Sequence, residues 1–176
     1  MILDDLLSDP DGLRQYAAQP EMDPLTEDDA LQEAQLLDVR FDALRSTAAL
    51  LFELRLALQL REANTAVLLA HGVRKLSWTA ESRSTARTAW NVLGSTPSTT
   101  DGVFSLALLI WPRAQLRLSA IRAAFVAGDV PGLDGPPPDY TSDDEATIQA
   151  GLAGWRSVFS PIHAVFLDPS PTGPGR

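Results

Sequence analysis

The feature that most constrains this chain is an alternation of apolar and polar residues at every second position. Leu37, Val39 and Phe41 alternate with charged residues, and every second residue from 52 to 60 is Phe or Leu. Strands place neighbouring side chains on opposite faces of a sheet, so this period is typical of strands with one buried face. In a helix the same residues would scatter around the axis, although their helix propensities favour one. The period therefore predicts strands over 37–42 and 52–60.

Further strands follow along the chain. Asn64 can turn the chain into the apolar segment 65–69, and His71-Gly72 interrupts the pattern before apolar residues resume over 73–78, which predicts a hairpin or a meander. Residues 90–93 and Val103–Trp111 are predicted as two more strands, and the residues from Pro97 to Gly102 between them have the composition of a turn. After Pro161, residues 162–167 alternate again and predict a closing strand.

Residues 112–128 fit two patterns. Leu116, Leu118 and Ala120 alternate as in a strand, whereas Leu118 also lies at helical spacing from other apolar residues (Ala114, Ile121 and Phe125). We favour the strand, which needs a bulge near Ala120-Ile121 to return the later apolar residues to the buried face. A helix remains the alternative.

One helix is predicted near the end of the chain. Ser142 and Glu145 match a capping box, and the two aspartates between them suit the positive end of a helix dipole. Apolar residues then follow at helical spacing (Ile148, Leu152 and Trp155), and we expect the helix to end near Gly154.

Proline content and charge divide the 176 residues into three parts. Residues 1–33 are predicted to form an acidic N-terminal arm with short helical turns near 3–7 and 13–18. Residues 169–176 are rich in proline and glycine and are predicted to be a flexible tail. We therefore predict a single domain over 34–168 of class α+β, mainly β: an antiparallel sheet of about six or seven strands with one C-terminal helix packed on it.

Charge is distributed unevenly. Residues 1–35 contain ten acids and one base, so they account for the whole formal net charge of −9. Residues 74–122 contain seven bases and two acids, a local charge of +5. We expect the arm either to fold back over these basic strands or to steer a basic partner toward the body, with fast and salt-dependent association. Docking also needs apolar anchors, which the arm supplies (Ile2, Leu3, Leu6, Leu7, Leu13 and Tyr16).

The chain has no cysteine, which favours a reducing compartment. Its first residues carry aspartates where a secretory signal carries bases. The longest uninterrupted apolar segment, Leu106–Trp111, is far shorter than the about 18 residues of a membrane-spanning helix. We therefore predict a cytoplasmic protein with no membrane partner.

His71 and His163 are the first candidates for acid–base or metal chemistry, because histidine titrates near neutrality. Neither lies in an HExxH or HxH pattern, so we interpret both as packed or surface side chains; a metal pair requires their strands to be neighbours. The carboxylates at 143–145 are interpreted as a helix start. The GxSxG, GxxxxGK[ST] and GxGxxG motifs are absent. The sequence therefore predicts no catalytic residue, no metal ligand and no cofactor.

Five residues are predicted to bind a partner. Glu27, Asp28 and Asp29 form an acidic cluster in the arm, and Trp78 and Trp90 are the other two, because an exposed tryptophan is a good interface anchor. Core packing is the alternative for each tryptophan, Trp111 and Trp155 included. The bases of 74–122 beside aromatic residues also suggest nucleic acid, but the neutral body and the acidic arm argue against it.

The succession of strands resembles a known family. The layout of 37–60, the segment Thr65-Ala-Val-Leu-Leu-Ala-His-Gly-Val-Arg-Lys-Leu-Ser-Trp78, and a late strand ending in Ala-Ala-Phe-Val-Ala-Gly128 resemble small β-rich immunity proteins of bacterial toxin systems. The resemblance concerns strand pattern across about half of the chain, and it carries over no functional residue. The preference for arginine over lysine also suggests a bacterial genome.

Three functions remain open. The first, which the resemblance favours, is a non-enzymatic protein-binding module, such as an immunity protein that neutralises a cognate toxin. The second is a structural or self-assembling homo-oligomeric subunit that uses an exposed sheet edge. The third is a small-ligand or enzyme module with a site around His71 or His163. Solution mass across a concentration series separates the first two, and an apolar pocket lined by a histidine favours the third.

Overall fold

Seven strands and three short helices form the computed structural model, which describes residues 1–8, 10–81 and 87–168. The strands are β1 (Gln35–Asp42), β2 (Thr47–Glu53), β3 (Thr65–Ala80), β4 (Trp90–Thr100), β5 (Val103–Trp111), β6 (Ala114–Asp129) and β7 (Ser160–Leu167). The helices are the 3-10 helices η1 (Leu3–Leu7) and η2 (Asp11–Tyr16) and the α-helix α1 (Glu145–Ala150). The predicted class, a mainly β protein with few helices, is confirmed. No helix among these residues is long and apolar enough to cross a membrane.

The sheet closes on itself through its two longest strands. Its order is β3-β2-β1-β4-β5-β6-β7, and β3 pairs additionally with β6. All of these pairings are antiparallel. β1 and β4 are joined by two residue pairs, Gln35 with Asn91 and Leu36 with Trp90. The junction between β1 and β4 is therefore narrow, and the two strands part beyond it.

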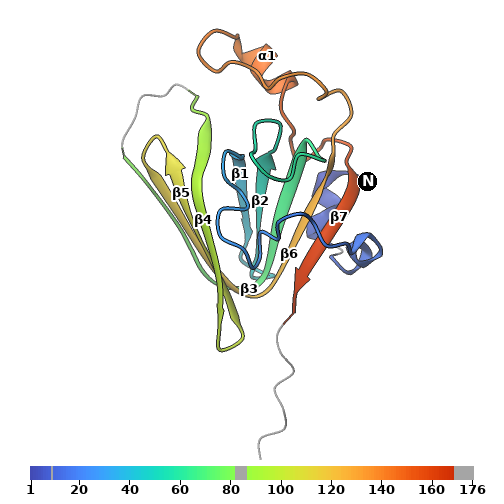
Figure 1. The fold of residues 1–176 in the computed structure, drawn as a ribbon, viewed down its shortest axis with the longest axis vertical. Helices are drawn as coiled ribbons and strands as arrows, with labels where there is room; N and C mark the ends of the chain where they lie inside the picture. The colour runs from blue at the N-terminus through green and yellow to red at the C-terminus, as the bar shows by residue number, and fades with distance from the viewer. Residues whose placement is uncertain (9, 82–86, 169–176) are drawn as a thin grey trace, which may run out of the picture.

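β3 and β6 each pass through two parts of the sheet, which we call limbs. In the first limb, residues 65–71 of β3 pair with 122–128 of β6, and β2, β1 and β7 flank them. In the second limb, residues 73–80 pair with 114–120, and β5 and β4 continue the sheet beyond β6. The limbs diverge as a V in Figure 1, with β4 and β5 on the left, β1 and β2 in the middle and β7 on the right.

The bend in β3 lies at Gly72. This residue has a φ of +65°, and a register shift between Val73 and Lys75 follows it. A Cβ added to Gly72 would lie 2.9 Å from Cγ1 of Ile121. Both the dihedral angle and the close contact favour glycine. A reversal of the chain at His71-Gly72 is therefore wrong, because the glycine redirects one continuous strand from the first limb into the second. The predicted turn near Asn64 is present, since β2 and β3 on either side of its loop pair antiparallel.

Residues 114–129 form the strand that we favoured over a helix. The residues that face the core lie at even positions up to Ala120 and at odd positions from Ala123 onward. The change occurs opposite residues 70–73 of β3, next to the register shift in that strand. β6 therefore changes its core-facing side near Ala120-Ile121, where we expected a bulge. The additional residue of the bulge lies in β3 and not in β6.

The strand predicted over 52–60 is wrong beyond Glu53. β2 begins earlier, at Thr47, ends at Glu53, and is followed by a loop. The Glu53 side chain is fully buried and accepts hydrogen bonds from Nε and Nη2 of Arg55, each at 2.7 Å. Glu53 therefore points into the protein and binds Arg55, at a position where the alternation predicts a solvated side chain. Leu56, at a predicted core position, is 52% exposed.

β4 is longer than predicted. It continues through Pro97 to Thr100, and the turn contracts to Asp101-Gly102, whose φ angles are +51° and +72°. Pro97 is tolerated because, among the described residues, no strand pairs with β4 on the side away from β5 at this position. β5 has the predicted bounds, and the predicted closing strand is present as β7.

α1 is shorter than the predicted helix of 142–154. Its N-cap is Asp144, whose carboxylate accepts a hydrogen bond from the Thr147 amide at 2.8 Å, and this bond lowers the pKa of Asp144. The predicted cap, Ser142, lies outside the helix. Trp155 follows α1 in the loop before β7, and its side chain is buried.

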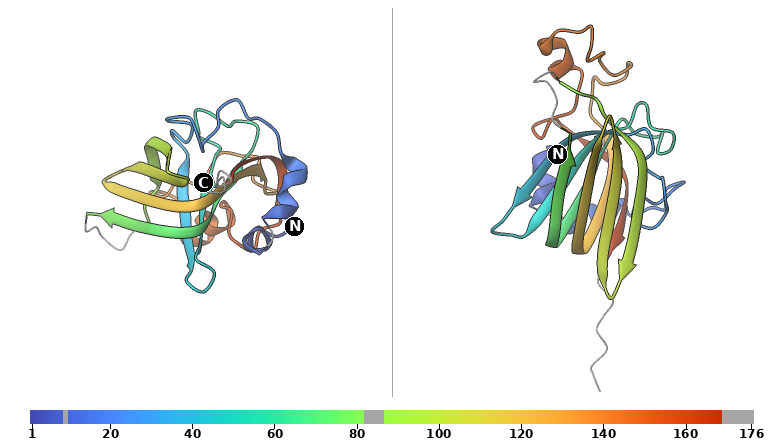
Figure 2. Two further views of the ribbon diagram at one scale, coloured as in Figure 1. Left: turned by 90° about the horizontal axis from the view of Figure 1, so that it is seen from below. Right: turned by 90° about the vertical axis from the view of Figure 1, so that its left-hand side faces the viewer.

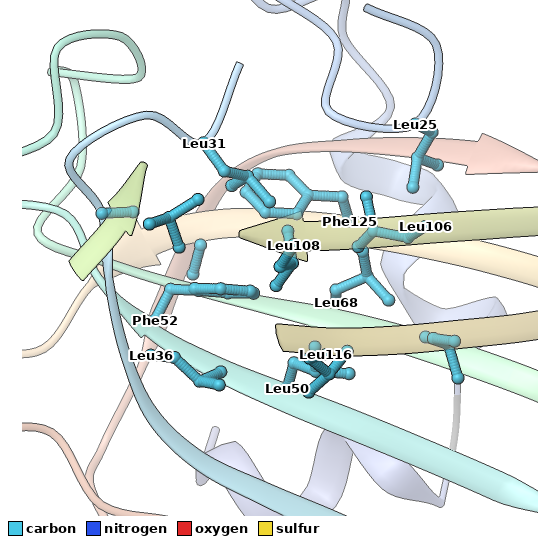
Figure 3. Packing of buried hydrophobic residues seen from close by; sticks show 14 of the residues in the cluster. Leu25, Leu31, Leu36, Leu50, Phe52, Leu68, Leu106, Leu108, Leu116 and Phe125 are labelled. Carbon is cyan, nitrogen blue, oxygen red and sulfur yellow. The ribbon is translucent and has the colours of Figure 1, made fainter. Parts of the chain in front are cut away.

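The main core lies between the two limbs (Figure 3). Phe52, Leu68 and Phe125 from the first limb face Leu106, Leu108 and Leu116 from the second. Two leucines of the arm, Leu25 and Leu31, complete the same cluster. This part of the arm therefore fills the space between the limbs.

A second cluster covers the outer face of the first limb. Strand residues such as Leu51 and Val67 pack there against Leu3, Leu6 and Leu13 of the arm. The predicted helical turns are thus present as η1 and η2, and they lie on the first limb. Among the described ion pairs, one joins residues 1–35 to residues 74–122: Arg122 Nη2 lies 3.6 Å from Asp11 Oδ1. The arm does not cover the remaining basic side chains with ion pairs in the described part of the chain.

Candidate functional site

A cleft opens where β1 and the second limb part. It lies between β1, the second half of β3 and the start of β4, and its volume is about 400 Å³. Apolar side chains and one carboxylate line it: Leu36, Leu37, Asp38, Val39, Leu76, Trp78, Trp90 and Leu116. We call this site the tryptophan cleft.

Strand pairing brings the two predicted tryptophans together. β3 places Trp78 opposite Leu116 of β6, and β4 places Trp90 opposite Leu36 of β1. The ring centroids are 5.1 Å apart at an interplanar angle of 89°. Such an edge-to-face contact contributes about 0.5–1.5 kcal/mol beyond area burial. Trp78 is nevertheless 44% exposed, so the pair forms an ordered apolar wall that solvent reaches.

Asp38 is the one charged residue of the cleft, and sequence reasoning missed it. Its Oδ2 accepts a hydrogen bond from Nε1 of Trp155 at 2.6 Å, and its Oδ1 accepts one from the Val39 amide at 2.8 Å. The Arg40 guanidinium lies 4.7 Å from the centroid of the Trp155 ring. These contacts fix the carboxylate at the free edge of β1. In the sequence, Asp38 looks like an ordinary solvated residue of a strand, because it alternates with apolar residues.

A larger hollow of about 730 Å³ adjoins the tryptophan cleft and shares residues 36–38 and Trp90 with it. Its far wall comes from the region of α1 and includes Tyr140 and Arg156. Burial, followed by the Glu53 carboxylate, raises the pKa of Tyr140 above its ordinary value. The combined groove is apolar at Trp78 and polar beneath α1.

The predicted acidic cluster does not line either hollow. Asp29 is bound to Ser95 of β4: its amide donates to the Ser95 carbonyl at 2.7 Å, and its Oδ1 accepts from the Ser95 amide at 3.1 Å. Glu27 accepts a hydrogen bond from the Asp23 amide at 2.8 Å. Asp28 is exposed. Glu27 and Asp29 therefore have structural contacts, whereas Trp78 and Trp90 form the candidate site.

The two histidines lie apart from the cleft and from each other. β6 separates their strands, and on β6 His71 is paired with Arg122 and His163 with Ala127. Burial, with the nearby Arg122, lowers the pKa of His71. His163 Nε2 lies 2.6 Å from Oε1 of Glu62. In residues 1–8, 10–81 and 87–168, no group of three His, Asp or Glu side chains could hold a metal ion.

Comparisons with known proteins give one structural likeness. No protein-family model matches the chain, and no curated protein matches its sequence. The structure is similar to the crystal structure of an uncharacterized protein from Neisseria gonorrhoeae, with 11% sequence identity and a TM-score of 0.42. The similarity covers 56% of this chain and 94% of that chain.

Proposed function

We propose that this chain is a non-enzymatic protein-binding module whose contact site is the tryptophan cleft. The observation that supports the proposal is the pair of Trp78 and Trp90, which holds a 44% exposed indole in a fixed position at an apolar cleft. Tryptophan is enriched among the residues that dominate interface energetics, because a partner can bury its large ring at little conformational cost.

The shape of the cleft favours a protein partner over a small molecule. Small-molecule sites bury about 70–90% of the ligand surface. Here Trp78 remains open to solvent, and the groove continues into the hollow beneath α1. A protruding apolar side chain fits the tryptophan end, while polar groups beside it can reach Asp38 and Tyr140.

The finer proposal is an immunity function in the cytoplasm. It comes from the sequence resemblance to immunity proteins of bacterial toxin systems, which implies a cognate toxin as the partner. On this proposal the toxin inserts an apolar side chain into the tryptophan cleft and is neutralised by occlusion of its own functional surface.

Affinity capture with matched baits tests the proposal. Full-length protein and the variants Trp78→Ala and Leu44→Ala are immobilised, and proteins from the source cell are quantified on each. Leu44 is the control, because it is 99% exposed in the β1–β2 turn. We expect a protein that wild type and Leu44→Ala retain and that Trp78→Ala loses by about tenfold or more. Equal retention by all three baits contradicts the proposal.

Folding and self-association are the two controls of this experiment. Trp78→Leu provides a second cleft variant that keeps an apolar side chain. The melting temperature of each bait shows whether it is folded. Sedimentation of wild type across a concentration series separates a partner from a second copy of the chain. A mass that rises with concentration and falls to the monomer in Trp78→Ala assigns the cleft to self-assembly and overturns the proposal.

A further inference from the structure

The second limb has an outer face that is distinct from the tryptophan cleft. Pairing places Trp78 on the core side with Leu116, whereas Ser77 is paired with Arg117 on the opposite side. The outer face is formed by the outward side chains of 73–80, β4, β5 and 114–120, whose strands lie side by side in the right-hand view of Figure 2. We call it the outer limb face.

The outer limb face carries positive charge and no carboxylate. The chain has 23 acids, yet none lies in 73–80, β4, β5 or 114–120. Lys75 and Arg117 are exposed there, Arg74 is exposed at the register shift beside Lys75, and no ion pair joins any of the three to another described residue. Arg117 is flanked by Ser77 on β3 and Ala107 on β5, which are too small to cover its guanidinium.

Apolar side chains occupy one end of the same face. Leu109 and Trp111 of β5 are each 52% exposed. Their partners on β4 are Gly94 and Asn91, and Leu93, at the register shift between Val92 and Gly94, is 42% exposed. On this face the half-exposed apolar side chains can supply binding energy. The cations without an ion pair can orient the partner.

From this arrangement we infer that the outer limb face is a second docking surface, for a protein partner with an acidic and apolar surface. The partner places a carboxylate against Arg117 and apolar side chains against Leu109 and Trp111. Charge complementarity selects this occupant. In a two-fold dimer whose axis passes near Arg117, Arg117 of each copy would oppose its own equivalent, which costs energy.

Nucleic acid fits the face less well. Trp111 is the one aromatic side chain on the outer side of these strands, whereas single-stranded nucleic acid is held by several stacking platforms along a continuous basic groove. The formal net charge of −9 also repels an extended phosphate backbone. An acidic protein surface needs only local complementarity.

Binding of a labelled copolymer of glutamate and tyrosine to the full-length protein at low salt tests the inference. The variant is Arg117→Glu, and the control is Arg61→Glu, which makes the same charge change at an exposed arginine outside the face. We expect Arg117→Glu to weaken binding by about tenfold or more and Arg61→Glu by less than about twofold. Trp111→Ala should also weaken binding, while a glutamate homopolymer should bind less tightly than the copolymer.

Three results overturn the inference. Equal losses in Arg117→Glu and Arg61→Glu show that only net charge matters. If a single-stranded oligonucleotide binds more tightly than the copolymer, and Arg117→Glu loses this binding, the face is assigned to nucleic acid. A concentration-dependent dimer in sedimentation that Arg117→Glu abolishes assigns it to a second copy. Melting curves establish whether the variants are folded. None of these three results bears on the tryptophan cleft, which the Trp78→Ala capture experiment tests separately.

Discussion

At the residue scale, the buried pair of Glu53 and Arg55 organises the loops at the end of the first limb. The guanidinium of Arg55 donates to the Gly135 carbonyl at 2.9 Å and to the Gly151 carbonyl at 2.6 Å, besides its two side-chain bonds to Glu53. A buried carboxylate without its partner is left uncompensated in a medium that solvates charge poorly. The guanidinium therefore joins three segments that are distant in sequence.

We predict that Arg55→Met lowers the free energy of unfolding by about 3–5 kcal/mol, because Glu53 then remains buried without a cation. Urea unfolding at neutral pH measures this loss. Arg45→Met is the matched control: the ion pair of Arg45 with Asp42 is largely exposed, so its loss should cost less than about 1 kcal/mol. Similar losses in both variants would contradict the role of the buried pair.

The same pair explains why residues 54–60 could not be predicted. Leucine occupies every second position there, much as apolar residues do in β1, and the period cannot tell whether the preceding Glu53 points to solvent or to a buried arginine. Leu60 also has a φ of +59°, a conformation that leucine rarely adopts and that composition does not reveal. Tertiary contacts of Glu53 override the local pattern.

At the element scale, the bend of β3 creates the two limbs and with them the cleft. The sequence indicates Gly72 as an interruption, but glycine suits a reversal as well as a kink. The pairing of β3 with β6 on both sides of Gly72 decides between them. Trp78 and Trp90 could likewise be named as anchors from the sequence, but their contact depends on the two-residue junction of β1 with β4, which no local pattern encodes.

We predict that Gly72→Ala destabilises the protein by about 1–3 kcal/mol, because a Cβ meets Ile121 and the φ of +65° is strained for alanine. Thermal unfolding measures the loss. Gly135→Ala should change stability by less than about 0.5 kcal/mol, since an added Cβ at Gly135 has no atom within 4 Å. A Gly72→Ala protein as stable as Gly135→Ala would show that the bend does not require glycine.

At the scale of the whole molecule, charge and apolar surface divide the protein into two regions. The acidic arm packs on the first limb and between the limbs through leucines, whereas the outer side of the second limb keeps its unpaired bases. Sequence analysis predicted the charge asymmetry but not its geometry, because the position of the arm depends on which sheet face is apolar. Leu3, Leu6, Leu13, Leu25 and Leu31 are each no more than 1% exposed, so the arm contributes to both cores.

We predict that Leu6→Ala lowers the free energy of unfolding by about 2–5 kcal/mol, because it leaves a cavity between η1 and the first limb. Chemical unfolding followed by circular dichroism gives the value. Leu44→Ala, at a 99% exposed leucine, should stay within about 0.5 kcal/mol of wild type. If Leu6→Ala is equally neutral, the packing of η1 on the first limb does not stabilise the fold.

The central claim is that the tryptophan cleft receives a protein partner. Backbone amide hydrogen exchange of the full-length protein, free and bound to the protein captured with it, tests this claim without any substitution. We predict slower exchange in residues 36–39 and 74–80 and at the start of β4, and unchanged exchange in the β1–β2 turn at 43–46, which lies outside the cleft. Protection that spares all three cleft segments, with the partner bound, would contradict the claim.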